Sequence, residues 1–152
     1  MRARSLSWWT ARGALIVLTL SALLVALFAR AAGADVHLLG LPGPELEFAR
    51  SLGFRGAWTR NELPELPYQA VVDASTAASL PSLAGELVEP GGRVVWIGLA
   101  GEPSLVDTRA LALKDVTAVG VLSASPALGG TIEAYAEGSV DPRPLVASTV
   151  GL

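Results

Sequence analysis

Short apolar runs separated by polar, glycine-containing segments predict an alternation of strands and helices from residue 35 onwards. The runs at 35–39, 68–73 and 93–97 are rich in leucine and β-branched residues and stop at glycine or aspartate, as buried strands do. Two further strands are predicted at 56–59 and 116–123. Because the longer runs are apolar at nearly every position, we expect both faces of these strands to be covered.

The segment from Pro44 to Gly53 is predicted to be a helix. Proline stands at its first position, acidic residues occupy its first turn, and Arg50 lies near its end, in agreement with the helix dipole. The residues expected to face the core are Phe48, Ala49 and Leu52.

Two more helices are expected, one over 80–88 with Ser79 as its N-cap and one over 131–137. Helices between successive strands act as crossovers, so the strands would run parallel, with helices on both faces of the sheet. Ligands of such doubly wound α/β sheets bind beyond the carboxyl ends of the strands, where the strand order reverses. Small residues, which let a flat ligand approach the backbone, stand at the ends Gly40, 73–75, 98–101 and 122–125.

An almost uninterrupted apolar segment, 13–29, precedes this pattern, with Arg12 and Arg30 on either side. As a helix it would rise about 25 Å, near the lower limit for crossing a membrane. The small residues 32–34 in front of Asp35 also resemble a signal-peptide cleavage site. A buried core helix of an α/β protein is the third alternative. The segment alone leaves all three open.

Composition excludes several classes of function. The chain of 152 residues has no cysteine, which excludes disulfide scaffolds and thiol chemistry. The net charge is −3, but the first 34 residues hold four arginines and no acid, whereas the remainder holds seven basic and 14 acidic residues. An acidic body is not expected to bind nucleic acid, which selects clustered Lys and Arg. His37 is the one histidine and no Gly-x-Ser-x-Gly turn is present, which argues against a Ser-His-Asp nucleophile.

The predicted elements include the segments ARAAGADV (29–36), EFARSLG (47–53), YQAVVD (68–73), EPGGRVVWIG (89–98) and LKDVTAVG (113–120). In this order and spacing they resemble the nucleotide-binding half of the medium-chain dehydrogenases/reductases, the zinc-type alcohol dehydrogenase superfamily. The resemblance extends from about Leu23 to Leu152. It divides the chain into an atypical apolar and basic segment, 1–22, and a partial Rossmann domain, 23–152.

The resemblance implies a domain that binds NAD or NADP, joined in the family to a catalytic domain with zinc ligands and a proton relay. It implies hydride transfer between an alcohol and a carbonyl compound. By position, Gly40 would lie near the adenine ribose, and Ala74 and Ser75 along the cofactor. The residues that would flank the nicotinamide are Ile97, Gly98, Leu99, Val121, Leu122 and Ser123. A basic residue at the position of Lys114 often lies near the cofactor groove in this family.

The sequence departs from the family where the phosphates would bind. The glycines of the phosphate-binding turn would fall at Val17, Thr19 and Ala22, whose side chains are expected to block both the tight turn and the approach of the pyrophosphate. The acidic residue that selects NAD is replaced by Gly40, which favours NADP, but no Arg or Lys stands at Leu41 to receive a 2′-phosphate. The choice between NAD and NADP is therefore open.

The catalytic half of the family is not represented. Without cysteine and with a single histidine the chain assembles no zinc site, and it stops before the family's last strand and helix. We therefore expect the dinucleotide-binding portion of an alcohol dehydrogenase-like oxidoreductase, cytoplasmic and inactive by itself. The alternative is an exported or membrane-anchored nonenzymatic α/β binding domain, with 1–34 as its signal or anchor. Substrate and oligomeric state are not predicted.

The first strand decides whether such a domain is complete. Residues 14–18 could occupy the central position of the sheet only if the chain turned at 19–22 without glycine. A single helix over 13–32 would leave that position empty and two strands without a neighbour. Because the family resemblance starts abruptly at Leu23, we expect a frame change or a truncated gene, an incomplete sheet, and an apolar helix in front of it. The upstream nucleotides, translated in the other frames, would then encode a strand and a glycine-rich turn.

Overall fold

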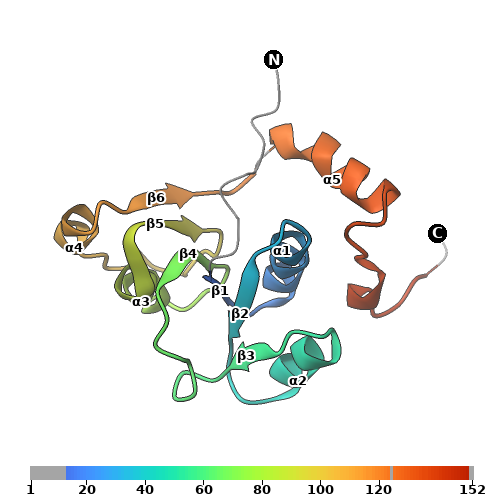
Figure 1. The fold of residues 1–152 in the computed structure, drawn as a ribbon, viewed down its shortest axis with the longest axis horizontal. Coiled ribbons are helices and arrows are strands. Elements are labelled where there is room, and N and C mark those ends of the chain that lie inside the picture. The colour runs from blue at the N-terminus through green and yellow to red at the C-terminus, as the bar shows by residue number, and fades with distance from the viewer. Residues whose placement is uncertain (1–12, 124, 151–152) are drawn as a thin grey trace.

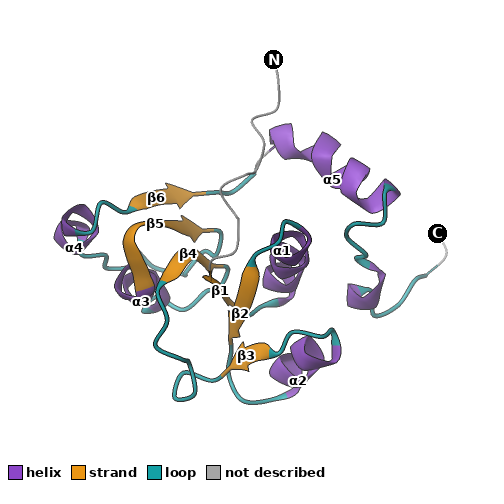
Figure 2. Cartoon of the chain, viewed as in Figure 1, coloured by secondary structure: helices purple, strands orange, loops and turns teal. Residues whose placement is uncertain are grey.

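The computed structural model describes residues 13–123 and 125–150. Its strands are β1 (Gly13–Val17), β2 (Asp35–Leu39), β3 (Gly56–Trp58), β4 (Tyr68–Asp73), β5 (Val88–Trp96) and β6 (Thr117–Gly120). Its helices are α1 (Leu20–Ala31), α2 (Pro44–Ser51), α3 (Leu80–Leu87), α4 (Thr108–Leu113) and α5 (Leu128–Ala136), with 3-10 turns at Ser125–Ala127 and Arg143–Leu145. Figures 1 and 2 show how these elements are arranged.

The strands form one sheet in the order β3-β2-β1-β4-β5-β6, and every neighbouring pair is parallel. Helices α1 and α2 pack on one face and α3 on the other, so the predicted doubly wound α/β architecture is confirmed. The chain winds outward from β1 to β3, returns to the centre at β4 and then winds the other way. Strand order therefore reverses between β1 and β4, and the carboxyl ends of these two strands define the expected binding edge.

The apolar segment 13–29 is a strand followed by a helix. Its first residues form β1, which pairs with β2 on one side and β4 on the other, so the central position is filled. The expected incomplete sheet with an apolar helix in front of it is therefore wrong. Such a run is ambiguous because a strand buried on both faces has no polar side to reveal its period. Helix α1 spans 12 residues, and no helix within 13–123 or 125–150 is long and apolar enough to cross a membrane.

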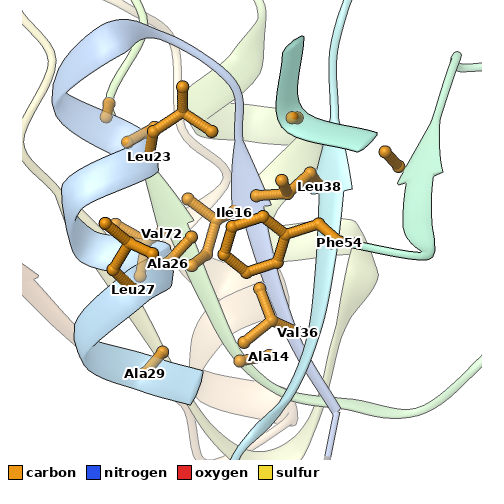
Figure 3. Packing of buried hydrophobic residues seen from close by; sticks show 14 of the residues in the cluster. Ala14, Ile16, Leu23, Ala26, Leu27, Ala29, Val36, Leu38, Phe54 and Val72 are labelled. Carbon is orange, nitrogen blue, oxygen red and sulfur yellow. The ribbon is translucent and has the colours of Figure 1, made fainter. Parts of the chain in front are cut away.

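Successive β1 side chains supply the two halves of the core. Ala14 and Ile16 join the cluster under α1, whereas Leu15 and Val17 join the cluster under α3. Figure 3 shows Leu23, Ala26 and Leu27 of α1 beside Ile16 and Val72 in the same cluster. This alternation, with a period of two, makes the strand apolar throughout and fixes its register.

Two details of the predicted helices differ from the structure. In α2 the buried residues are Leu46 and Ala49, whereas the side chain of Phe48, which was expected to face the core, is 37% exposed. Ser79 precedes α3 as expected, but its side chain makes no capping hydrogen bond. The rotation of a short helix is decided by the residue that best fills the space over the sheet, and Leu46 fills it here.

Candidate functional site

The turn from β1 into α1 forms without glycine. Thr19 is the N-cap of α1 with φ −148° and ψ 175°, an extended conformation that any residue adopts. Its Oγ1 accepts a hydrogen bond from the Ala22 N–H at 3.2 Å and donates to the Ala74 carbonyl at 3.3 Å. The expectation that side chains would block the tight turn is therefore wrong. The threonine hydroxyl accepts a hydrogen bond from a helix N–H group that would otherwise be free to donate to a phosphate.

The carboxyl end of β2 lies directly beside this turn. Gly40 follows β2, and its N–H donates to the carbonyl of Trp58 at the end of β3, 3.0 Å away. A Cβ at position 40 would stand 3.0 Å from Leu18 Cδ2 and 3.2 Å from Leu18 Cβ. A side chain on residue 40 would therefore pack tightly against Leu18, which would have to shift by a few tenths of an ångström.

The ends of β4 and β5 are held together by a buried carboxylate and by close backbone packing. Asp73 is 2% exposed, and its Oδ1 accepts from the Ser75 N–H at 2.9 Å and from Ser75 Oγ at 2.8 Å. The Asp73 carbonyl accepts from the N–H groups of Ile97 and Gly98. A Cβ at Gly98 would lie 1.7 Å from the Ser75 carbonyl oxygen, so this position accepts only glycine.

A cleft of about 500 Å³ opens at the carboxyl ends of β1, β2 and β4, beside the start of α3. Gly40 and Ser75, two of the sequence-predicted cofactor contacts, line it together. The other lining residues are Val17, Leu18, Thr19, Leu39, Leu41, Arg60, Thr76, Ala77, Ser79, Leu80 and Leu83.

The remaining predicted contacts lie outside this cleft. Ala74 is buried beneath Thr19, and Ile97 and Gly98 lie against Asp73 and Ser75. The residues proposed to flank a nicotinamide continue along the ends of β5 and β6, where the side chains of Leu99 and Leu122 are 69% and 83% exposed. Val121 is tied to β5 by its N–H, which donates to the Trp96 carbonyl, and Ser123 is exposed. The structure therefore groups these residues at one edge of the sheet, and the cleft described above lies at the Gly40 and Ser75 end.

The fold is shared with solved dehydrogenases. No protein-family model matches the sequence, and no curated protein sequence matches it. Alcohol dehydrogenase TADH from Thermus sp. ATN1 superposes with a TM-score of 0.78 at 24% identity over 91% of this chain. A short chain alcohol dehydrogenase from E. coli CFT073 complexed with NADH gives 0.75 at 18% over 88%. A Sinorhizobium meliloti 1021 protein bound to NADP, provisionally named a zinc-binding dehydrogenase, gives 0.76 at 18% over 88%.

This is a Rossmann-like fold, shared with one part of solved alcohol dehydrogenases. The superposed region corresponds to 43% or 44% of each of these three neighbours, so the chain spans less than half of their length. At identities of 24% and below, the likeness concerns the fold and assigns no residue of this chain to a function.

The residues of this nucleotide-binding fold fit the two ends of an adenine dinucleotide unequally. At the adenosine end, Gly40 presents no side chain to the cleft, and Thr19 and Ser75 line the same hollow. The turn that would bind the pyrophosphate lacks the glycines of the family, because Val17, Thr19 and Ala22 carry side chains. The Ala22 N–H is already bonded to Thr19.

Zinc ligands are absent from the described part of the fold. Within residues 13–123 and 125–150 no group of three His, Cys, Asp or Glu side chains is placed to hold a metal ion. His37 is 7% exposed; its Nδ1 accepts from Trp58 Nε1 at 3.0 Å and its Nε2 lies 3.5 Å from Asp35 Oδ2. Both ring nitrogens are therefore engaged within the protein.

The basic residue beside the cleft is not the one that the family resemblance suggested. Lys114 lies away from the cleft, and its Nζ donates to the carbonyls of Gly85, Glu86 and Val88 at the end of α3. Arg60, which sequence reasoning missed, lines the cleft instead. The available signal was its place just after the predicted strand 56–59, since parallel strands end at the same edge of a sheet.

Proposed function

We propose that this chain is the dinucleotide-binding portion of an alcohol dehydrogenase-like oxidoreductase and that it binds NAD(H) or NADP(H). The supporting observation is the cleft at the carboxyl ends of β1, β2 and β4, at the reversal of strand order where doubly wound sheets bind their ligands. Gly40 and Ser75 contact the adenosine end in this proposal. Ala74, Ile97, Gly98, Leu99 and residues 121–123 extend the contact along the same edge toward the nicotinamide.

The side chains present indicate which roles belong to the protein and which belong to the cofactor. The nicotinamide supplies hydride chemistry when bound, and the protein binds and orients it. Asp73 fixes the Ser75 hydroxyl and backbone, and Thr19 fixes the end of β4 through Ala74. With no cysteine and a single histidine, this chain by itself is expected not to oxidise alcohols by zinc catalysis.

A titration of the folded chain with NADPH and with NADH tests the proposal. We expect saturable binding, measured by the change in nicotinamide fluorescence and by equilibrium dialysis. Ala77→Phe, which places a ring in the cleft, is expected to weaken binding, whereas Ala112→Phe on the exposed side of α4 is expected to leave it unchanged. A sample folded by circular dichroism that binds neither dinucleotide would contradict the proposal.

A further inference from the structure

The end of β2 presents no acid, and a side chain there would be tightly packed. In nucleotide-binding sheets a carboxylate here bonds the ribose hydroxyls and repels a ribose phosphate. In this chain the position is Gly40, and a side chain attached there would press against Leu18. The lining of the cleft contains no Asp or Glu. The acid described beside Gly40 is Glu45, which lines the adjoining hollow and not this cleft.

Arg60 supplies a positive charge to the same cleft. It follows β3, whose last residue, Trp58, pairs with Leu39 and accepts the hydrogen bond of the Gly40 N–H. The side chain of Arg60 lines the cleft with Gly40 and Leu41 and also borders the adjoining hollow, which includes Glu86. Among the residues that the structure describes, no carboxylate lies within salt-bridge distance of its guanidinium.

The turn that carries Arg60 is closed by its neighbours. Glu62 Oε2 accepts from Thr59 Oγ1 at 2.8 Å and from the Thr59 N–H at 3.2 Å, and the Glu62 N–H donates to the Thr59 carbonyl. These hydrogen bonds lower the pKa of Glu62, so its carboxylate is committed to Thr59. The nearest acid in sequence thus shapes the turn and leaves the guanidinium available to a ligand.

The other cations near hollows are engaged elsewhere. Arg30 donates to the Leu52 carbonyl and lies 4.4 Å over the Phe54 ring, and Arg50 donates to the Ala57 carbonyl. A planar guanidinium matches the oxygens of a phosphate. We propose that Arg60 binds the phosphate of a 2′-phosphorylated adenosine, so that this site takes NADP(H) in preference to NAD(H). The inference rests on the proposed function and identifies which cofactor that function uses.

Two fragments of the cofactors, adenosine 2′,5′-bisphosphate and 5′-AMP, test the assignment by titration calorimetry. The wild-type chain is expected to bind the bisphosphate about ten- to hundredfold more tightly than 5′-AMP, the range for a hydrogen bond between charged groups. Arg60→Gln removes this preference, so that the variant binds the bisphosphate and 5′-AMP with similar affinities. Arg60→Lys retains part of it. Arg55→Gln is the matched control, because this exposed arginine precedes β3 and stands at its opposite end.

The outcomes separate the inference from the proposal on which it rests. Equal binding of NADPH and NADH by the wild type, or a bisphosphate preference that persists in Arg60→Gln, overturns the role of Arg60 and leaves dinucleotide binding intact. A folded wild type that binds neither dinucleotide and neither fragment overturns both. Because Arg60 is exposed, the substitution is expected to leave the fold unchanged, which circular dichroism checks.

Discussion

The side chain of Leu18 lies over the backbone of Gly40, with Leu18 Cδ2 only 3.0 Å from where a Cβ on residue 40 would stand. The two residues belong to different segments, one after β1 and the other after β2. The size of each side chain restricts the size of the other. A leucine in the β1–α1 turn favours glycine at the end of β2, because any side chain there would press against it. The missing acid at position 40 therefore has a packing cause in addition to its effect on the charge of the cleft.

Gly40→Val is expected to destabilise the protein by about 1–3 kcal/mol through overpacking against Leu18. In a Leu18→Ala background the same substitution should cost less, by a coupling of at least about 0.5 kcal/mol. Urea unfolding of the four proteins in this cycle measures the difference. Gly101→Val is the control, since nothing lies within 4 Å of a Cβ at that position. Strict additivity of the two substitutions would show that Leu18 and Gly40 are independent.

Gly98→Ala is expected to be more damaging, at about 3 kcal/mol or more, because the obstacle is backbone. A Cβ would stand 1.7 Å from the Ser75 carbonyl oxygen, and no side-chain rotation removes that contact. The ends of β4 and β5 would have to separate, breaking the hydrogen bonds from Ile97 and Gly98 to the Asp73 carbonyl. Thermal unfolding compared with Gly101→Ala measures the effect, and equal melting temperatures would refute it.

Lys114→Met is expected to lower stability by about 1–2 kcal/mol, because three carbonyls lose a charged donor. Those carbonyls, of Gly85, Glu86 and Val88, lie 2.7–3.2 Å from Lys114 Nζ at the end of α3. Chemical denaturation provides the measurement. Arg109→Met on the exposed side of α4 is the comparison, and a loss no larger than its own would contradict the assigned role.

The ion pair between Asp141 and Arg143 is expected to make the stability of the protein depend on pH in the acidic range. Hydrogen bonds from the Arg143 side chain and N–H lower the pKa of Asp141 from 3.8 to about 2. A carboxyl group whose pKa is lowered by folding stabilises the protein at pH values above its ordinary pKa. That contribution is lost as the pH falls from about 4 toward 2. Carboxyl chemical shifts followed by nuclear magnetic resonance should report a midpoint near 2, and a higher one in Arg143→Gln, which loses the side-chain hydrogen bonds but keeps the backbone N–H donor. Identical titrations would exclude the pairing in solution.

Thr19→Gly is expected to tighten NADPH binding severalfold at little cost to stability. Glycine is an acceptable N-cap that costs only a few tenths of a kcal/mol relative to threonine, and it removes both the side chain and the internal acceptor of the Ala22 N–H. Thr19→Ser keeps that acceptor and should bind like the wild type. Dissociation constants of the three proteins decide the matter, and weaker binding by the glycine variant would show that the threonine hydroxyl contacts the nucleotide.

The alternation of strands and helices from Asp35 onwards could be predicted because each run ends at glycine, proline or a charged residue. The segment 13–29 could not, since a strand buried on both faces and a buried helix have the same composition. The neighbouring strands decide between a strand and a helix here, and only the tertiary structure shows that β2 and β4 pair with this segment. The division of the chain at Leu23 falls inside α1 and stays a prediction about origin, which the upstream nucleotide sequence will test.

The candidate site was predictable only in part. Gly40 and Ser75 stand at strand ends, so the rule for parallel sheets brings them to one edge. Arg60 and Leu18 were missed for different reasons. Arg60 follows the short edge strand, whose order in the sheet no periodicity reveals, and the contact of Leu18 with Gly40 depends on the twist between neighbouring strands.

The central place of β1 also constrains how the chain is assembled during translation. Strand β1 is made before both of its neighbours: β2 follows it directly after α1, but β4 is made only after α2 and β3. Until Asp73 has emerged, one edge of a wholly apolar strand has no partner in the nascent chain, and unpaired edges of this kind favour aggregation. The interval between the synthesis of Val17 and Asp73 is therefore the period in which the growing protein most needs a chaperone.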